Sequence, residues 1–259
     1  MAATILVKQA LWRVSQQLLD TDPQFEHWEQ IELVDHLNDT ASLICALVPL
    51  ANSRVDAIKL RQGTRQSIAT IAAADCKPGD GSTPTTPIYG LQVIAPRRNM
   101  GGNGMTPGNA IRVVERDMMD ALVPDWHTKT GSRVRSVVYD PQDPHTFYVS
   151  PGVPGTPNVW IELAYSAQPS KVPNVGTEDY SLAGTNTTVI PVDDEYIDAL
   201  VNGILARANM KDTTYASRPK VAEHNELFLA TLRGKIQAIT GTDPNLTTLP
   251  GVSQPAART

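Results

Sequence analysis

The chain has 259 residues, of which 41% are hydrophobic and 19% are charged, and its formal net charge is −5. This length and composition suit a globular protein of one or two domains, and no apolar run approaches a membrane span. The acidity argues against a high-affinity DNA-reading protein, residues 1–12 lack the pattern of a signal peptide, and Cys45 and Cys76 are too few for a disulfide framework or a zinc site.

The charge is distributed unevenly along the chain. Residues 1–48 carry two basic and seven acidic side chains, whereas residues 54–137 carry twelve basic and seven acidic ones. Blocks of opposite sign suggest docking between copies or with partners, and ordinary solvation of the surface is the alternative. The side chains expected at contacts between subunits are Glu29, Glu32, Asp35, Arg97, Arg98 and Arg112.

Apolar spacing predicts two helices at the start of the chain, over residues 3–19 and 23–48. Asp22 is a suitable N-cap for the second helix, and Pro49 ends it. The predicted buried stripe of the first helix is Val7, Leu11, Val14 and Leu18. The predicted buried face of the second is Leu33, Leu37, Ala41, Ile44 and Val48. The pair reads as an antiparallel helical hairpin.

The middle of the chain has β character. Residues 54–71 read as two short strands with a turn at Gln62–Thr64, and residues 89–95 as another strand. Residues 75–87 and 99–109 are loops by composition. Residues 110–123 are predicted to form a short helix, with Val113, Met118 and Leu122 facing inward.

The stretch from Ser136 to Pro169 predicts a hairpin with a wide loop. Residues 145–149 are rich in β-forming side chains, and residues 159–165 alternate with period two. Three prolines and two glycines in residues 150–158 indicate that neither helix nor sheet continues there. Trp160 falls on the opposite face from Ile161, which fits a sheet covered on both faces or a subunit interface.

The C-terminal third returns to helical patterns. After a polar connection over residues 170–188, a strong helix opens at Pro191 with Ile197, Leu200, Val201, Ile204, Leu205 and Ala208 on its apolar face. A last helix is predicted over residues 219–239, with Val221, Phe228, Leu232, Ile236 and Ile239 on its inner face. Residues 241–259 form no element by pattern and read as an arm.

Candidate chemistry is sparse. The run 99–104 has glycines but no following Gly-Lys-Ser/Thr, so a loop is favoured over a phosphate site. Asp193, Asp194 and Glu195 could hold a hard cation or simply favour a helix N-terminus. No converging catalytic or metal-binding residues emerge, so we predict neither an enzyme nor a cofactor. Trp126 or Trp160 could serve as a sugar platform in an alternative reading as a carbohydrate-binding β module.

Several segments, taken in order, carry a family resemblance. They are Gly63-Thr64-Arg65-Gln66, Leu91-Gln92-Val93-Ile94, Arg97-Arg98-Asn99-Met100-Gly101, Ala110-Ile111-Arg112, Pro124-Asp125-Trp126-His127, Tyr139-Asp140-Pro141-Gln142-Asp143-Pro144, Phe147-Tyr148-Val149-Ser150-Pro151, residues 162–169 and residues 190–196. The chain resembles the head-to-tail adaptor (connector) proteins of short-tailed bacteriophages, of the tail tubular protein A type. It departs from them in a longer loop at residues 75–88.

The resemblance implies a structural protein of the virion neck or tail, assembled in the host bacterial cytoplasm without a membrane. Such proteins form a ring, usually dodecameric, under the portal protein. The ring extends the channel for double-stranded DNA, which passes without sequence recognition during ejection, and it contacts the tail nozzle. Another tail or neck component, such as a nozzle or completion protein, is the alternative.

We therefore predict an α+β fold. Residues 1–50 and 190–240 should form a helical bundle, and residues 54–170 a β-rich, sandwich-like module with a short helix near 110–123. Residues 241–259 should be an extended C-terminal arm that binds the portal. Its expected apolar anchors are Leu246, Leu249 and Val252, while Pro244 and Pro250 would limit the entropy cost of docking.

Overall fold

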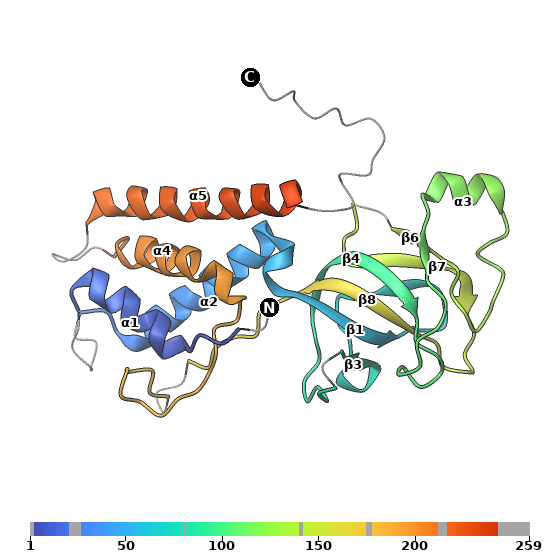
Figure 1. The fold of residues 1–259 in the computed structure, drawn as a ribbon, viewed down its shortest axis with the longest axis horizontal. Helices are drawn as coiled ribbons and strands as arrows, with labels where there is room; N and C mark the ends of the chain where they lie inside the picture. Colours follow the sequence, from blue (N-terminus) through green and yellow to red (C-terminus); the bar gives the residue numbers. More distant parts are fainter. Residues whose placement is uncertain are drawn as a thin grey trace, which may run out of the picture. The chain divides into compact units, whose positions relative to one another are not determined.

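The α+β prediction is confirmed by the structure, a computed structural model that describes residues 3–20, 27–79, 81–139, 142–174, 178–211 and 217–242. The chain divides into two units, one of Met1–Ile44 with Lys171–Thr259 and the other of Cys45–Ser170 (Figure 1). The first, the helical unit, thus includes the connection from Lys171, and the second, the β unit, includes residues 45–50, which the sequence assigned to the bundle.

The helical unit is built around one buried helix. Its helices are α1 (Val7–Leu18), α2 (Gln30–Leu47, which runs into the β unit), α4 (Ile197–Ala208) and α5 (Arg218–Thr242). α4 lies between α5 on one side and α1 and α2 on the other (Figure 1). Nine of its twelve residues are buried, as expected for a helix covered on most sides. The apolar face predicted for α4 is buried throughout and is confirmed.

The predicted helix boundaries need four corrections. α2 begins at Gln30 rather than at residue 23, since the described residues 27–29 are not helical. α1 begins at Val7 rather than residue 3, because residues before it are extended and Leu6 forms a β-bridge with Val189. α4 is preceded by a 3-10 turn at Asp194–Tyr196, so the helix does not open at Pro191. α5 continues to Thr242, past the predicted end at residue 239. The proposed N-cap Asp22 lies outside the described residues.

The buried faces of the other helices are mostly as predicted. All five residues of the predicted α2 face, from Leu33 to Val48, are buried. In α5, Phe228 and Leu232 are buried, but Ile236 is 39% exposed and does not belong to the inner face. α5 therefore rests on α4 through its middle turns.

The β unit is a sandwich of two four-stranded sheets. The first sheet has the order β3 (Cys76–Pro78), β1 (Ser53–Lys59), β8 (Trp160–Ala167), β4 (Gly90–Asn99). The second has the order β2 (Gly63–Ser67), β7 (Thr146–Val153), β6 (Ser136–Tyr139), β5 (Arg112–Val113). A short helix, α3 (Arg116–Leu122), and 3-10 turns at Pro49–Asn52 and Ala73–Asp75 complete the unit. β1 begins where β8 ends, with Ser53 opposite Ser166.

The predicted hairpin between residues 145–149 and 159–165 is wrong. β7 pairs with β2 and β6, whereas β8 pairs with β1 and β4 in the other sheet. Phe147 and Val149 of β7 belong to the same buried core as Ile161 and Leu163 of β8, so the two strands belong to one core but not to one sheet. β7 also continues through Pro151 to Val153, which the proline-based boundary did not allow.

The inner face predicted for residues 110–123 is also wrong. This segment forms the short strand β5 and then α3, and Val113, Met118 and Leu122 are 61%, 55% and 72% exposed. Met119 is the buried residue instead, in a small cluster with Trp126 and Val138. The helical stripe is therefore offset from the predicted one, because a seven-residue helix that packs through one turn buries few positions.

This offset predicts a contrast between adjacent methionines. Met119→Ala should lower the free energy of unfolding of the β unit by about 2–3 kcal/mol, since it removes a buried side chain from a packed cluster. Met118→Ala should change it by less than about 0.5 kcal/mol, as is usual for exposed positions. Urea unfolding of both variants would measure the difference. Equal effects of the two changes would contradict the observed orientation of α3.

Candidate interaction surfaces and polar networks

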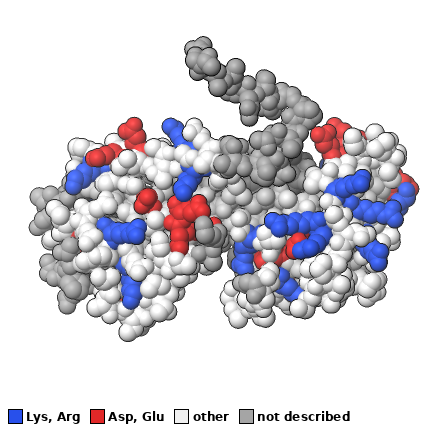
Figure 2. All heavy atoms as spheres, in the orientation of Figure 1, with Lys and Arg blue, Asp and Glu red and all other residues white. Residues whose placement is uncertain are grey.

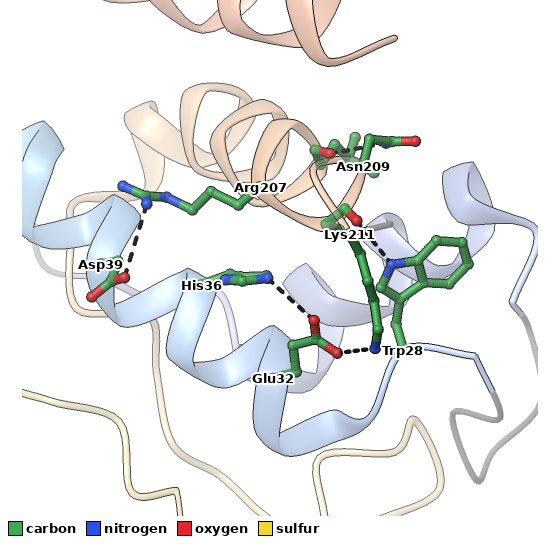
Figure 3. A network of polar contacts seen from close by, with 9 residues as sticks. Trp28, Glu32, His36, Asp39, Arg207, Asn209 and Lys211 are labelled. Atoms are coloured by element: carbon green, nitrogen blue, oxygen red, sulfur yellow. Dashed lines mark hydrogen bonds and ion pairs between the residues drawn. The ribbon is translucent and has the colours of Figure 1, made fainter. Parts of the chain in front are cut away.

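A polar network within the helical unit joins α2 to α4 and to Lys211, which follows α4 (Figure 3). Glu32 Oε2 accepts a hydrogen bond from Lys211 Nζ at 2.5 Å, and its other carboxylate oxygen lies 3.8 Å from His36 Nε2. Arg207 donates to Thr40 Oγ1 at 3.2 Å and lies 3.9 Å from the Asp39 carboxylate. Burial, assisted by Arg207, lowers the pKa of His36 despite the nearby carboxylates. The network holds the two helices in register and leaves His36 neutral near pH 7.

The three acidic residues predicted for contacts between subunits differ in whether they already have a partner in their own chain. Glu32 is engaged by Lys211, and Asp35 Oδ1 accepts a hydrogen bond from Asn174 Nδ2 at 2.6 Å. Glu29 is exposed, and within the described part of the chain no ion pair involves it. Two of the three carboxylates are therefore already used inside their own chain.

The three basic residues predicted for the same contacts also differ from one another. Arg98 of β4 makes two hydrogen bonds to Glu162 of β8, at 2.9 and 3.0 Å, and these raise its pKa. Arg97 and Arg112 are exposed. The structure thus assigns Arg98 to a cross-strand pair and leaves the side chains of Arg97 and Arg112 on the surface of the β unit.

The acidic run at residues 193–195 binds the segment that precedes α1. Asp194 accepts hydrogen bonds from the backbone N–H groups of Thr4 and Ile5, at 2.8 and 3.0 Å, and from the Thr4 hydroxyl. These bonds lower the pKa of Asp194. Glu195 lies 3.5 Å from Lys235 of α5. Neither residue acts as a helix cap here, and the described residues contain no group of three or more His, Cys, Asp or Glu placed to hold a metal ion.

A second buried network lies in the first sheet of the β unit. The Tyr165 hydroxyl donates to Asp56 Oδ2 at 2.7 Å, and Arg54 Nε lies 3.3 Å from the same oxygen. The Cys76 thiol lies 3.7 Å from it. Burial beside the Asp56 carboxylate raises the pKa of Tyr165 and raises that of Cys76 to about 12, so both remain protonated donors at neutral pH. The network ties β1, β3 and β8 together and was not found from the sequence.

Both tryptophans considered as sugar platforms are buried. Trp126 is 1% exposed, stacks on His127 with ring centroids 3.5 Å apart, and donates from Nε1 to Asp120 at 2.8 Å. Trp160 is 6% exposed, with Lys77 Nζ 5.0 Å from its ring centroid. A sugar platform needs an open ring face, so these residues do not support the carbohydrate-binding reading.

The glycine-rich loop after β4 closes over Trp160. A Cβ at Gly104, where φ is +72°, would lie 2.8 Å from the Trp160 ring. Asn103 Oδ1 accepts hydrogen bonds from the backbone N–H groups of Met105 and Thr106, at 3.0 and 3.2 Å. The glycines thus serve a tight loop that covers the ring of Trp160 on the second face of β8.

The predicted portal-binding residues, Pro244, Leu246, Leu249, Pro250 and Val252, lie outside the described residues. α5 ends at Thr242, immediately before them. The helices within the described ranges are all too short or too polar to cross a bilayer.

These features define a two-unit α+β protein in which the polar networks described above join segments within each unit. The chain belongs to the SU10 adaptor protein family, whose sequence model matches residues 7–249. No curated protein matches the chain. Family membership indicates a structural role as a phage head-to-tail adaptor, a virion protein of the neck. The narrower tail tubular protein A type stays a prediction.

Proposed function

We propose that this adaptor assembles as a ring, of twelve copies by resemblance, beneath the portal protein of its phage. The ring extends the channel for double-stranded DNA and connects the portal to the tail nozzle. The observation that supports this most directly is the family match, which runs through both units from residue 7 to residue 249.

The two units differ in charge, and this difference supports assembly through unlike surfaces. The helical unit, with its terminal segments, has ten basic and seventeen acidic residues, and the β unit has twelve basic and ten acidic ones. A head-to-tail contact between unlike surfaces closes into a ring when the rotation between copies is right. Glu29 on the acidic side and Arg97 and Arg112 on the basic side are the predicted contact residues that have no ion pair in the described structure.

Ring closure of this kind should weaken as salt is added, because exposed charges are screened over about 8 Å at physiological ionic strength. We expect the fraction of protein in rings, counted by electron microscopy of portal–adaptor mixtures, to fall between about 0.05 and 0.5 M NaCl. Glu29→Lys should lower the ring fraction at low salt and flatten its fall with added salt, because it replaces an attractive contact with a repulsive one, and Glu29→Gln should do the same to a smaller degree. A ring fraction that is independent of salt would count against the charge contact.

The C-terminal arm is the proposed portal-binding segment. Removing residues 243–259 should leave the helical circular dichroism and the melting temperature unchanged and weaken portal binding at least tenfold. The full-length variant with Leu246, Leu249 and Val252 changed to Ser should bind the portal equally weakly, because the apolar anchors are removed while the arm keeps its length. Portal binding that is unaffected by both changes would refute the assignment.

The overall proposal is tested by mixing the protein with its phage's portal and imaging the product by electron microscopy. A ring stacked coaxially on the portal is the expected result. A protein that does not bind the portal but is found at the distal tail would instead be a nozzle or completion protein.

A further inference from the structure

Asn99, the last residue of β4, joins three segments of the β unit. It is 5% exposed. Its Oδ1 accepts a hydrogen bond from the Val134 N–H at 2.8 Å, and its Nδ2 donates to the carbonyls of Val134 and Asn109 at 2.8 and 3.0 Å. The end of β4, the segment leading into β5 and the segment leading into β6 are therefore held against one another at this side chain.

Four arginines surround this junction. Arg97 precedes it on β4, and its carbonyl accepts a hydrogen bond from the Ile111 N–H. Arg112 donates its backbone N–H to the carbonyl of Arg135. Arg133 and Arg135 flank Val134, the residue that Asn99 binds. All four side chains are exposed. We call Arg97, Arg112, Arg133 and Arg135 the arginine cluster.

Four of the seven basic residues of the β unit that form no ion pair with a described carboxylate belong to the cluster. Five acidic residues of the described β unit already have basic partners: the pairs are Arg54–Asp56, Lys59–Asp75, Arg98–Glu162, Arg116–Asp120 and Lys129–Asp125. No arginine of the cluster forms an ion pair with a carboxylate that the structure describes. On the face shown in Figure 2, basic side chains outnumber acidic ones over the β unit. Four like charges held on adjoining segments repel one another unless an anion lies among them.

We propose that the arginine cluster binds the phosphate backbone of duplex DNA. The guanidinium group presents a planar fork of donors that matches phosphate oxygens, and phosphate contacts carry no sequence information. Neighbouring strands lie about 4.8 Å apart, so arginines on adjoining segments can reach phosphates along one groove edge. This inference rests on the proposed function, since an adaptor channel brings DNA past the protein. It adds that this chain holds the DNA at a defined place.

The competing partner is a carboxylate surface of a neighbouring copy. Of the three acidic residues predicted for that contact, Glu32 and Asp35 are already engaged in their own chain, which leaves Glu29 for Arg97 and Arg112. Arg133 and Arg135 are not among the predicted contacts between subunits, so the test is made on them. A duplex, by contrast, offers a continuous row of anions to arginines that lie on several adjoining segments.

The test is fluorescence anisotropy with a labelled 20-base-pair duplex and the full-length protein at several NaCl concentrations. Arg133→Ala with Arg135→Ala should weaken binding at least tenfold at low salt. It should also reduce the slope of log K against log salt by about 1.8, because each neutralised phosphate contributes about 0.9 to that slope. The matched control is Arg61→Ala with Arg65→Ala, which removes the same charge from exposed positions elsewhere in the β unit and should change affinity less than twofold. Arg133→Lys with Arg135→Lys should keep the slope and reduce the affinity in part.

An equal weakening of binding in the two alanine variants would overturn the proposal, since it would show a diffuse charge effect. Absence of duplex binding by the unmodified protein would overturn it as well. If Arg133→Ala with Arg135→Ala abolishes ring formation on the portal while duplex binding is unchanged, the cluster binds a neighbouring copy instead. Because DNA binding is measured on the free protein, its outcome is separate from whether the protein binds the portal.

Discussion

Gly203→Ala should destabilise the helical unit by about 1–3 kcal/mol, the range expected when a packed core is overfilled at a close helix contact. A Cβ at Gly203 would lie 2.3 Å from Thr40 Cγ2 of α2 and 3.3 Å from the Phe228 ring of α5. α4 is buried between these helices, so the added methyl group cannot turn away. Urea unfolding followed by circular dichroism at 222 nm would measure the change in stability.

Two further variants make this prediction specific. Gly234→Ala in α5 meets nothing within 4 Å and should stabilise the unit by about 0.5–1 kcal/mol through helix propensity alone. Thr40→Ser removes the Cγ2 methyl and keeps the hydroxyl that accepts from Arg207, so it should restore much of the stability when combined with Gly203→Ala. A Gly203→Ala variant as stable as the unmodified protein would show that α2 and α4 are farther apart than described.

Asp56→Ala should destabilise the β unit by about 3–5 kcal/mol, because it leaves Tyr165 and Arg54 without their shared acceptor. Tyr165→Phe removes only the donor and should cost about 1–2 kcal/mol, since the Asp56 carboxylate keeps Arg54. Asp56 is 3% exposed, so water does not take the place of the missing carboxylate. Amide hydrogen exchange in β1 and β8 would localise the change to the first sheet.

The double variant separates the effect of the hydrogen bond from the effect of packing. Asp56→Ala combined with Tyr165→Phe should cost less than the sum of the single changes, because each removes one end of the same 2.7 Å hydrogen bond. Strictly additive effects would mean that the two groups do not interact in solution.

The helices were predictable because their apolar residues recur at helical spacing. The α4 stripe from Ile197 to Ala208 repeats at helical spacing, and a helix that buries such a stripe needs no knowledge of its partner. Alternation identified the strand β8 in the same way, but β3 lies in a segment predicted as a loop and β5 in one predicted as a helix. Alternation reports which residues of β8 share a face, although both faces of this strand are buried, and it does not report which strand lies beside it. The hairpin prediction failed on that point.

For the charged residues too, the sequence pattern does not identify the partner of a side chain. Arg97 and Arg98 are adjacent and chemically identical, yet only Arg98 binds Glu162, because the register of β4 against β8 shifts between Pro96 and Arg98. Asn99 read as the start of a loop, although its amide organises three segments. Asp56 and Asp194 likewise bind groups that lie far away in the sequence. Such partners depend on long-range topology, which local pattern does not contain.

The pairing of Ser53 with Ser166 has a consequence for how this protein can vary. The β unit is inserted in the sequence of the helical unit. The start of its first strand pairs with the end of its last strand, so the chain enters and leaves the β unit at neighbouring points. An insertion whose two ends are neighbours can be exchanged for another domain, or deleted, while the chain on either side still meets. Selection could therefore exchange the β unit as one piece to suit a new partner, while the core around α4 stays unchanged.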